Sequence, residues 1–567
     1  MSATRRDFIT AAGVLAASAA CAPALRLGSR HRHDVVIRGG TVFDGTGAAG
    51  VERDVAISNG VVTAIGADID GRAREEVDAR GKAVAPGFID IHSHGDESLF
   101  ADPRSESVIR QGVTTIVVGQ DGDSRAPSAR PVTAAGIVRG ALGTNGAFES
   151  MHELFRAVNG LPPAVNVASM VGLGTIRGLV VGEDDRPATP GELRQMRALV
   201  EGALADGACG VSTGLEYAPG SFASRDELIA LCRPLAARRL PYATHMRNED
   251  DTLIEAIDEA IAIARGAGCP LQISHLKTSG PRNWHKIGDA LGRVDAARAG
   301  GLDVTFDRYP YVAYQTGLTN LFPIWALDGG ADAFLRRLTA SDTADRIRTA
   351  TLGKIDKLAG WNSVMISGVA VPADRDAEGQ RLGDYAAKLG EDPYAVTVGL
   401  LQRSHTDVGT VVFAMSEDNL QRFLAHPSAM VCSDGGAFAL EGPARRGHPH
   451  PRGLGTFPRV LGRYVRETKT LTLEQAIHKM SGFPASRIGL GDRGRIAPGM
   501  AADVVVFDPA TVIDRATFAE PFQYPVGIDV VIINGSVALR DGQRFEARRG
   551  RALRPGALAS ARAASTS

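Results

Sequence analysis

Two histidines separated by a single residue stand at the end of an apolar run. His92 and His94 close the segment that begins at Pro86. Because alternate side chains of an extended strand lie on the same face, both imidazoles can reach one metal ion. A His-x-His pair taken by itself is equally compatible with the polar end of a core strand. The interpretation therefore depends on partners elsewhere in the chain.

Four further polar residues occupy equivalent positions downstream. Each of them stands where a predicted apolar strand stops: Asp121, His245, His275 and Asp434. In a parallel barrel the carboxyl ends of the strands converge on one face, where barrel enzymes carry their catalytic residues. Imidazoles and carboxylates together predict a site for one or two divalent ions, and the imidazole content favours zinc.

The elements that must position these residues alternate between helix and strand. Helical spacing of apolar residues predicts helices over residues 190–205, 251–265 and 287–297. Short apolar runs predict strands at residues 209–215, 241–245, 271–275 and 302–307. This order predicts an α/β fold with a parallel sheet, and over residues 85–485 it favours a closed (β/α)8 barrel of the TIM type.

A charged, helix-rich stretch near residues 319–360 interrupts this rhythm. It predicts an insertion of the kind that forms a lid over a substrate site. A final helix is expected over residues 473–480, before the chain returns to short strands.

Short strands and turns flank the barrel at both ends of the chain. Asn59-Gly60 and Asn534-Gly535 each separate two apolar runs and predict tight hairpins, because both turn residues must tolerate positive φ. Residues 34–84 and 486–548 are therefore expected to form one small composite β-sandwich domain. Residues 551–567 are rich in Ala, Arg and Ser and are expected to be disordered.

The first 30 residues resemble a twin-arginine export signal. Arg5-Arg6 precedes an Ala-rich run, and small residues follow around Ala22-Pro23-Ala24. The run from Ile9 to Ala20 is shorter than the roughly 20 residues that span a bilayer, and no later stretch is long and apolar enough. We expect export to the periplasm by the twin-arginine route, without a transmembrane span, and a lipoprotein anchor at Cys21 is the weaker alternative.

The overall charge points to a small-molecule partner. Because 63 basic residues stand against 64 acidic ones, the chain has no overall field that would attract nucleic acid. The five cysteines show no Cys-x-x-Cys pair and no regular spacing, which argues against a disulfide framework. Cys209, Cys269 and Cys432 lie beside apolar strands and are expected to be buried core thiols.

Longer motifs give the sequence a family resemblance that extends from about Asp34 to Gly535. The chain resembles the amidohydrolase superfamily in IRGGTVFDGTG at residues 37–47, APGFIDIHSH at 85–94 and GRIAPGMAAD at 494–503. It is similar to the N-acyl-D-amino-acid deacylases, or D-aminoacylases, in a second set of segments. These are GVSTGLEYAPG at 210–220, THMRNE at 244–249, SHLK at 274–277, DRYPY at 307–311, SDG at 433–435 and HPRG at 450–453.

The resemblance implies a zinc-dependent hydrolase that cleaves the amide bond of N-acyl-D-amino acids. In this interpretation one zinc ion is held by Asp121, His245 and His275, and a second one by His92 and His94. The ion lowers the pKa of a bound water toward 7.

Asp434 is the expected catalytic residue, which takes the proton of the water and passes it to the departing amine, and it is also a candidate metal ligand. Lys277 and Arg452, with Tyr309 or Tyr311, are expected to hold the substrate carboxylate, since Arg offers a bidentate grip.

Two alternative functions remain at this stage. A cyclic-amide hydrolase of the dihydroorotase or hydantoinase type, or a metallodipeptidase, would use the same metal site. Such enzymes often bridge their metals with a carboxylated lysine on a barrel strand, and the chain has no convincing lysine in that position. A non-catalytic binding protein on the same fold is the third interpretation, and the complete ligand set argues against it.

The sequence departs from the family pattern at three places. Asp121 stands where such deacylases usually present a metal-ligating cysteine, and a carboxylate can also ligate or bridge zinc. Ala313-Tyr314-Gln315-Thr316 replaces the usual Ala-Gly-Ser-Thr, and Leu173 replaces a histidine. The last two changes lie on the expected substrate side, so the preferred amino acid stays open.

Overall fold

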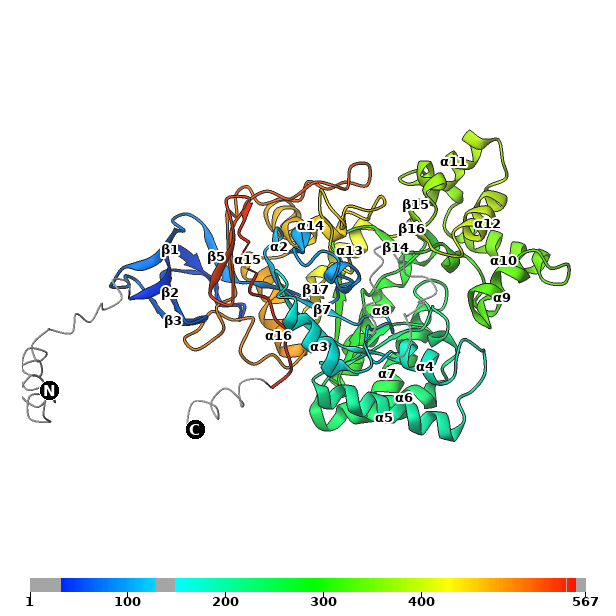
Figure 1. The fold of residues 1–567 in the computed structure, drawn as a ribbon, viewed down its shortest axis with the longest axis horizontal. Coiled ribbons are helices and arrows are strands. Elements are labelled where there is room, and N and C mark those ends of the chain that lie inside the picture. The colour runs from blue at the N-terminus through cyan, green and yellow to red at the C-terminus, as the bar shows by residue number, and fades with distance from the viewer. Residues whose placement is uncertain (1–31, 129–147, 547, 557–567) are drawn as a thin grey trace, which may run out of the picture.

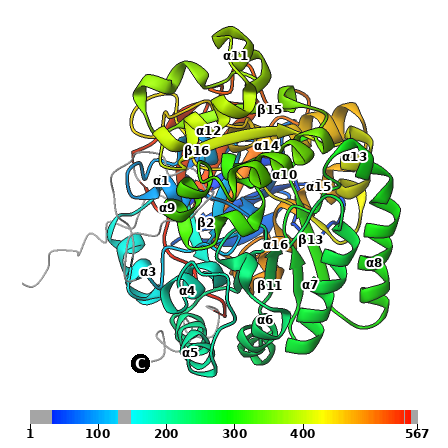
Figure 2. The ribbon, with the colours of Figure 1, turned by 90° about the vertical axis from the view of Figure 1, so that its right-hand side faces the viewer.

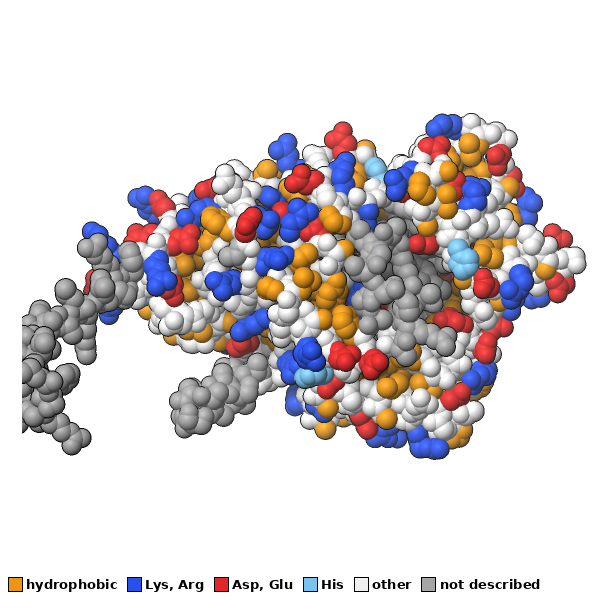
Figure 3. Space-filling model, viewed as in Figure 1, with side chains coloured by type: hydrophobic (Ala, Val, Ile, Leu, Met, Phe, Trp, Pro, Cys, Tyr) orange, Lys and Arg blue, Asp and Glu red, His pale blue; other side chains and the backbone are white. Residues whose placement is uncertain are grey.

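The computed structural model describes residues 32–128, 148–546 and 548–556 (Figure 1). The expected export signal and Cys21 lie outside these ranges. Within them, no helix combines the length and the apolar character needed to cross a membrane. Basic and acidic side chains are interspersed over the face of the molecule shown in Figure 3.

The centre of the molecule is a ring of parallel strands. Its members are β6 (Phe88–Asp90), β7 (Val113–Val118), β8 (Asn166–Ser169), β9 (Val171–Gly172), β10 (Val211–Gly214), β11 (Tyr242–His245), β12 (Leu271–Ile273), β13 (Val304–Arg308) and β17 (Ala429–Val431). Parallel pairing runs from β6 to β8 and from β9 to β17, and only Met170 separates β8 from β9. Beyond β17 the ring closes through two backbone hydrogen bonds, from Asp434 N to His92 O (2.8 Å) and from His94 N to Gly435 O (3.0 Å). The expected (β/α)8 barrel is confirmed.

Helices cover the outside of the barrel (Figure 2). Helix α7 shows why they form, since Leu253, Ile257, Ile261 and Ala264 recur at helical spacing and are all buried. The helices between and after the barrel strands are α1 (Asp96–Leu99), α2 (Glu106–Ile109), α3 (Met151–Gly160), α4 (Leu173–Val180), α5 (Pro190–Asp206), α6 (Arg225–Cys232), α7 (Leu253–Ala267), α8 (Ile287–Ala299), α13 (Glu417–Ala425), α14 (Arg452–Arg459), α15 (Leu473–Met480) and α16 (Gly482–Arg487).

Strands from both ends of the chain form one composite sheet, which Figure 1 shows at the end of the molecule opposite α9–α12. Strand β5 pairs in antiparallel fashion with β18, and this pair joins the first segment to the last. Asn59-Gly60 and Asn534-Gly535 form the two expected hairpin turns, with positive φ at all four residues. The strands are β1 (His33–Val42), β2 (Val51–Ser58), β3 (Val61–Gly66), β4 (Ala73–Asp78), β5 (Ala83–Pro86), β18 (Val504–Phe507), β19 (Ile528–Ile533), β20 (Ser536–Arg540) and β21 (Gln543–Arg544).

A buried polar network fastens this sheet to the barrel. The carboxylate of Asp503, just before β18, accepts hydrogen bonds from Arg493, from Asn166 Nδ2 (3.0 Å) and from the backbone N–H of Asn534 (2.7 Å). Asn166 begins barrel strand β8, and its Oδ1 accepts from Asn534 Nδ2 at 2.8 Å. One carboxylate therefore links the composite sheet to a strand of the barrel.

The insertion is larger than the sequence predicted. It runs from β14 to β16 and contains a three-stranded antiparallel sheet besides its helices. The stretches that form β15 and β16 are β-branched runs, which pack against the helices in a separate hydrophobic core. Its elements are β14 (Ala313–Gly317), η4 (Leu318–Leu321), α9 (Gly330–Arg337), α10 (Ala344–Lys357), β15 (Val364–Val369), α11 (Leu382–Leu389), α12 (Pro393–Arg403) and β16 (Val408–Phe413).

The expectation of disorder from Arg551 onward is wrong for residues 551–556. Arg551 O accepts a hydrogen bond from Val167 N (2.9 Å), and Leu553 N donates to Val167 O (2.8 Å). This segment therefore lies along barrel strand β8, and Leu553 is buried. Composition alone suggested a solvated tail, because the single buried apolar residue Leu553 stands among many Ala and Arg residues.

Replacing Asp503 with Ala is expected to lower the free energy of unfolding by about 3–5 kcal/mol. The substitution removes the close, buried ion pair of Arg493, whose side chain is 1% exposed, and leaves it with the longer ion pair to Asp492 at 3.8 Å. Urea unfolding followed by circular dichroism measures the change. Asp78→Ala removes an exposed ion pair with Arg80 and is expected to leave the unfolding midpoint in place. Equal shifts in the two variants would contradict this assignment.

Candidate metal centre

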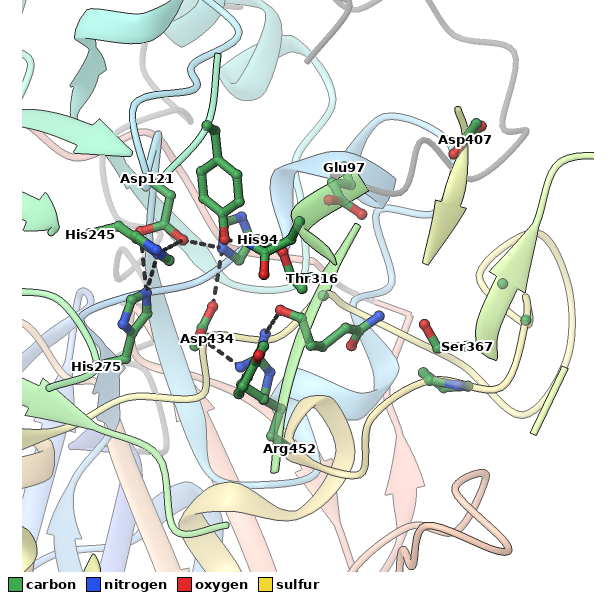
Figure 4. A pocket seen from close by; sticks show the side chains of 18 of the residues that line it. His94, Glu97, Asp121, His245, His275, Thr316, Ser367, Asp407, Asp434 and Arg452 are labelled. Atoms are coloured by element: carbon green, nitrogen blue, oxygen red, sulfur yellow. Dashed lines mark hydrogen bonds and ion pairs between the residues drawn. The ribbon is translucent and has the colours of Figure 1, made fainter. Parts of the chain in front are cut away.

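The six candidate ligands lie together at the carboxyl ends of barrel strands. His92 and His94 follow β6, and Asp121 follows β7 after a short turn. The others follow the same rule, since His245 ends β11 while His275 and Asp434 come just after β12 and β17. Except for the fully buried His92, all of them line one cavity of about 310 Å³ (Figure 4).

A first group of ligand atoms combines two histidines with two carboxylates. The Nε2 atoms of His92 and His94 each lie 3.4 Å from Asp121 Oδ2. The same two nitrogens lie 3.6 and 3.2 Å from Asp434 Oδ1. Four ligand atoms therefore surround one point at the floor of the cavity.

A second group uses the same Asp121 carboxylate. Asp121 Oδ1 lies 3.5 Å from His275 Nε2, and Asp121 Oδ2 lies 4.0 Å from His245 Nδ1. The two imidazole nitrogens face each other at 3.1 Å. Because Asp121 belongs to both groups, its carboxylate is placed to bridge two ions.

The spacing of these atoms fits zinc. Zinc bonds to nitrogen and oxygen measure about 2.0–2.1 Å, so neighbouring ligand atoms of a tetrahedral site lie about 3.3 Å apart. Except for the distance between His245 and Asp121, the separations in both groups cluster around this value. His92 Nε2 and Asp121 Oδ1 are also buried without a hydrogen-bond partner, and an ion would satisfy both atoms.

The electrostatics of the first group favour a bound cation. Burial alone would lower the pKa of His94, but hydrogen bonds and charge from Asp121 and Asp434 outweigh it and raise the pKa to about 10. The pKa of His92 is raised for the same reason, again against the effect of burial. The negative charges of Asp121 and Asp434 therefore favour a positive charge between them and the two histidines, and a divalent ion would supply it.

The backbone is strained at three of the candidate ligands. Asp121, His275 and Asp434 have φ angles of 53°, 36° and 49°, in the left-handed region that non-glycine residues rarely adopt. Such conformations persist where the surroundings impose them, and they cluster at functional sites. Here each of them turns a side chain into the barrel mouth directly after a strand.

Three further carboxylates, which the sequence did not single out, lie behind the histidines. Each one faces the ring nitrogen that points away from the ligand groups, the arrangement that commonly fixes the orientation of metal-binding imidazoles. They are Asp307 beside His92 (3.6 Å), Glu216 beside His245 (3.5 Å) and Glu249 beside His275 (3.0 Å). Asp307 stands near the end of β13 and Glu216 just after β10, so both could have been found by the strand-end rule, whereas Glu249 lies in the loop that follows β11.

Two of the four residues expected to hold a substrate carboxylate line the cavity. Lys277 donates to Glu249 and lies 2.8 Å from His275 Nδ1. Arg452 donates from Nη1 to Asp434 Oδ2 at 2.6 Å (Figure 4). Burial raises the pKa of Asp434, but the guanidinium of Arg452 and nearby histidines outweigh it, so the pKa lies below its usual range.

Tyr309 and Tyr311 are buried and do not line the cavity. The ring of Tyr309 packs under the guanidinium of Arg452, 4.8 Å from its centre, and so supports that side chain. Tyr311 donates to Asp514 Oδ2 at 3.3 Å, away from the metal centre. In this geometry both tyrosines support the site from outside.

The insertion forms one wall of the cavity. The sequence predicted an insertion but not which of its residues face the ligands. Gln315 O accepts from Arg452 Nη2 at 3.4 Å, and Thr316 Oγ1 lies 3.2 Å from the hydroxyl of Tyr217. Both residues belong to β14, in the segment that departs from the family pattern. Further cavity-lining residues of the insertion are Tyr314, Asn320, Lys354, Ser367, Gly368, Val369, Ala370, Arg375, Glu378 and Asp407.

Comparison with known proteins agrees with this geometry. The amidohydrolase family model matches residues 75–328 and 446–539. An N-acyl-D-glutamate deacylase of Alcaligenes xylosoxydans xylosoxydans is 39% identical over 502 residues, which cover 88% of this chain and 93% of the relative. A D-aminoacylase of the same organism is 37% identical over 503 residues, or 89% and 94% of the two chains.

A solved structure extends the comparison to the fold. The N-acyl-D-glutamate deacylase of Bordetella bronchiseptica, complexed with zinc and a phosphonate inhibitor that mimics the tetrahedral intermediate, is 37% identical and superimposes with a TM-score of 0.78. The match covers 92% of this chain and 99% of that one. This chain therefore belongs to the amidohydrolase family and, within it, to the N-acyl-D-amino-acid deacylases.

Proposed function

We propose that this protein is a zinc-dependent hydrolase that cleaves N-acyl-D-amino acids to a carboxylate and a free D-amino acid. The observation that carries the proposal is the pair of ligand groups that share Asp121, at the floor of a cavity that also holds Arg452 and Lys277. Relatives of similar length act as N-acyl-D-glutamate deacylase and D-aminoacylase, which supports the same chemistry.

Zinc would be held by Asp121, His245 and His275 in one group and by His92, His94, Asp121 and Asp434 in the other. When bound, zinc activates a water molecule and polarises the carbonyl of the amide. The protein orients the ligands. Carboxylates behind the histidines surround the ligand groups with buried negative charge that would balance the charge of the metal.

Asp434 is placed to move the proton. Its Oδ1 atom faces the histidines of the first group, and its Oδ2 atom is held by Arg452. The guanidinium keeps the carboxylate ionised and therefore ready to accept a proton from the attacking water. Asp434 would then deliver that proton to the nitrogen of the departing amine.

Arg452 and Lys277 provide positive charge for the carboxylate of the substrate. Both are buried side chains at the cavity wall, where a charge pair with a ligand is little screened. The planar guanidinium gives directional contacts, whereas the ammonium group acts as a point charge. Together they would fix the amino-acid end of the substrate beside the metal ligands.

A substrate screen tests the proposal directly. Purified protein with added zinc is expected to hydrolyse N-acetyl-D-amino acids in preference to the L-enantiomers, with release of the amine as the readout. Hydantoins, dihydroorotate and dipeptides are assayed in parallel. Hydrolysis of L-forms alone, or of cyclic amides alone, would overturn the proposal.

Asp434→Asn is expected to lower kcat by about 10²–10⁴-fold, because the amide cannot accept the proton. Zinc content is measured on the same sample, since Asp434 also belongs to a ligand group. Asp374→Asn, which removes another buried carboxylate with an arginine partner, serves as the matched control. Near wild-type turnover of Asp434→Asn with zinc bound would refute the proton-shuttle role.

Asp121→Ala is expected to remove zinc from both groups, whereas His94→Ala disturbs only one of them. Dialysis against a weak chelator followed by atomic absorption gives the zinc content per chain. The expected order of zinc content is wild type, then His94→Ala, then Asp121→Ala. Equal zinc content in the two variants would contradict a shared carboxylate.

We propose further that the chain is exported by the twin-arginine route. The support is the Arg5-Arg6 pair ahead of an Ala-rich apolar run. Replacing both arginines with Lys is expected to retain the protein in the cytoplasm, as measured by cell fractionation and immunoblotting. Arg26→Lys changes an arginine of the same segment outside the pair and is the control, so equal retention in both variants would count against the route.

A further inference from the structure

The imidazole of His245 is held between the metal centre and a carboxylate. Its Nδ1 atom faces Asp121 and His275, and its Nε2 atom faces Glu216 Oε2 at 3.5 Å. Glu216 follows β10 in the chain, and its side chain is only 16% exposed. No hydrogen bond forms at this distance, but the negative charge of Glu216 beside Nε2 favours the proton on that nitrogen and leaves Nδ1 to bind the metal.

The insertion in turn holds Glu216. Asn320 of η4 donates from Nδ2 to Glu216 Oε2 at 3.3 Å. Lys354 of α10 donates from Nζ to Asn320 Oδ1 at 3.2 Å. Since an ammonium group can only donate and a carboxylate can only accept, the amide of Asn320 has one orientation that satisfies both neighbours.

These contacts form a continuous chain from the insertion to a metal ligand. We infer that Glu216, Asn320 and Lys354 act together as positioning residues for His245, so that the insertion sets the affinity of the zinc group of Asp121, His245 and His275. The inference rests on the proposed zinc site and goes beyond it. It assigns to the insertion a role in metal binding besides its role as a cavity wall.

A third metal ion is the competing explanation for the carboxylates around His245. Ligand atoms of Glu216, His245 and Glu249 lie within 4.8 Å of one another. However, Glu249 already accepts a hydrogen bond from the ammonium group of Lys277, and it lies 3.0 Å from His275 Nδ1. A divalent ion at that place would lie beside a buried ammonium charge, which argues for the positioning role.

The expected effects follow from the order of the chain. Loss of an outer carboxylate behind a metal-binding histidine typically costs 10–100-fold in metal affinity. We therefore expect Glu216→Ala to weaken zinc binding by about 10–100-fold, and Asn320→Ala and Lys354→Met to weaken it by smaller factors. Because Asn320 acts through Glu216, adding Asn320→Ala to Glu216→Ala is expected to produce no further loss.

Competition with a chromogenic chelator measures the zinc dissociation constant and stoichiometry of the full-length protein, without any substrate. Lys357→Met, on the same helix as Lys354 but paired with Asp251, is the matched control and should bind zinc like the wild type. The absorption spectrum of the cobalt-substituted protein reports ligand geometry and is expected to change in Glu216→Ala, Asn320→Ala and Lys354→Met, but not in Lys357→Met. Thermal unfolding of the metal-free variants checks that the fold is intact.

Several results would overturn the inference. Unchanged zinc affinity in Glu216→Ala, or an equal loss in Lys354→Met and Lys357→Met, would show that the chain of contacts does not reach the metal. A wild-type stoichiometry of three zinc ions that falls to two in Glu216→Ala, with the affinities of the remaining two ions unchanged, would favour a third ion. If Glu216→Ala does not fold, Asn320→Ala and Lys354→Met decide the question alone. Absence of zinc binding in the wild type would instead defeat the proposed function.

Discussion

One buried carboxylate lies between two sets of histidines, and much of the structure serves to hold it there. Asp121 faces His92 and His94 on one side and His245 and His275 on the other. Two divalent ions at such close range would repel each other strongly in a buried site, and a negative charge between them reduces that repulsion. Strand β7 ends just before Asp121, and the left-handed backbone conformation of Asp121 turns its carboxylate toward the histidines. Strand β6 beside it, and strands β11 and β12 further around the barrel, supply the imidazoles. Position and charge are thus set by the same ring of strands.

Barrel and insertion contribute differently to the site. The barrel strands carry every candidate metal ligand, because parallel strands end at one edge and hold their last residues rigidly. The insertion has its own hydrophobic core and sheet, and it supplies the wall that faces the ligand groups. Glu216 is one point where the two parts meet, since it contacts both a barrel histidine and an insertion asparagine. Catalytic chemistry and substrate shape can therefore vary separately in this architecture, except at such contacts.

Much of the barrel and the proposed ligand set could be predicted from sequence, because apolar runs that end in polar residues are a local signal. His245 and Asp434 belong to this class. Glu249 could not be found in this way, since it lies in a loop four residues beyond β11, whereas Glu216 directly follows a predicted strand and was overlooked because carboxylates are common at such positions. For Tyr311 the motif suggested a contact with the substrate carboxylate. In the structure its hydroxyl group donates a hydrogen bond to Asp514 instead. The extent of the insertion and the packing of residues 551–556 were not predicted for one reason, since composition does not reveal which residues find a buried partner.

The composite sheet also constrains how the molecule is made. Strand β5 leads directly into β6 and the two histidines that follow it, yet β5 finds its partner β18 near the other end of the chain. Residues 551–553 complete the hydrogen bonding of β8 later still. A chain that emerges from the ribosome from its N-terminus forward cannot form these contacts until residues 504–507 and 551–553 have been synthesised. Strand β5, which leads into the first two candidate ligands, is therefore among the last strands of the molecule to find its partner.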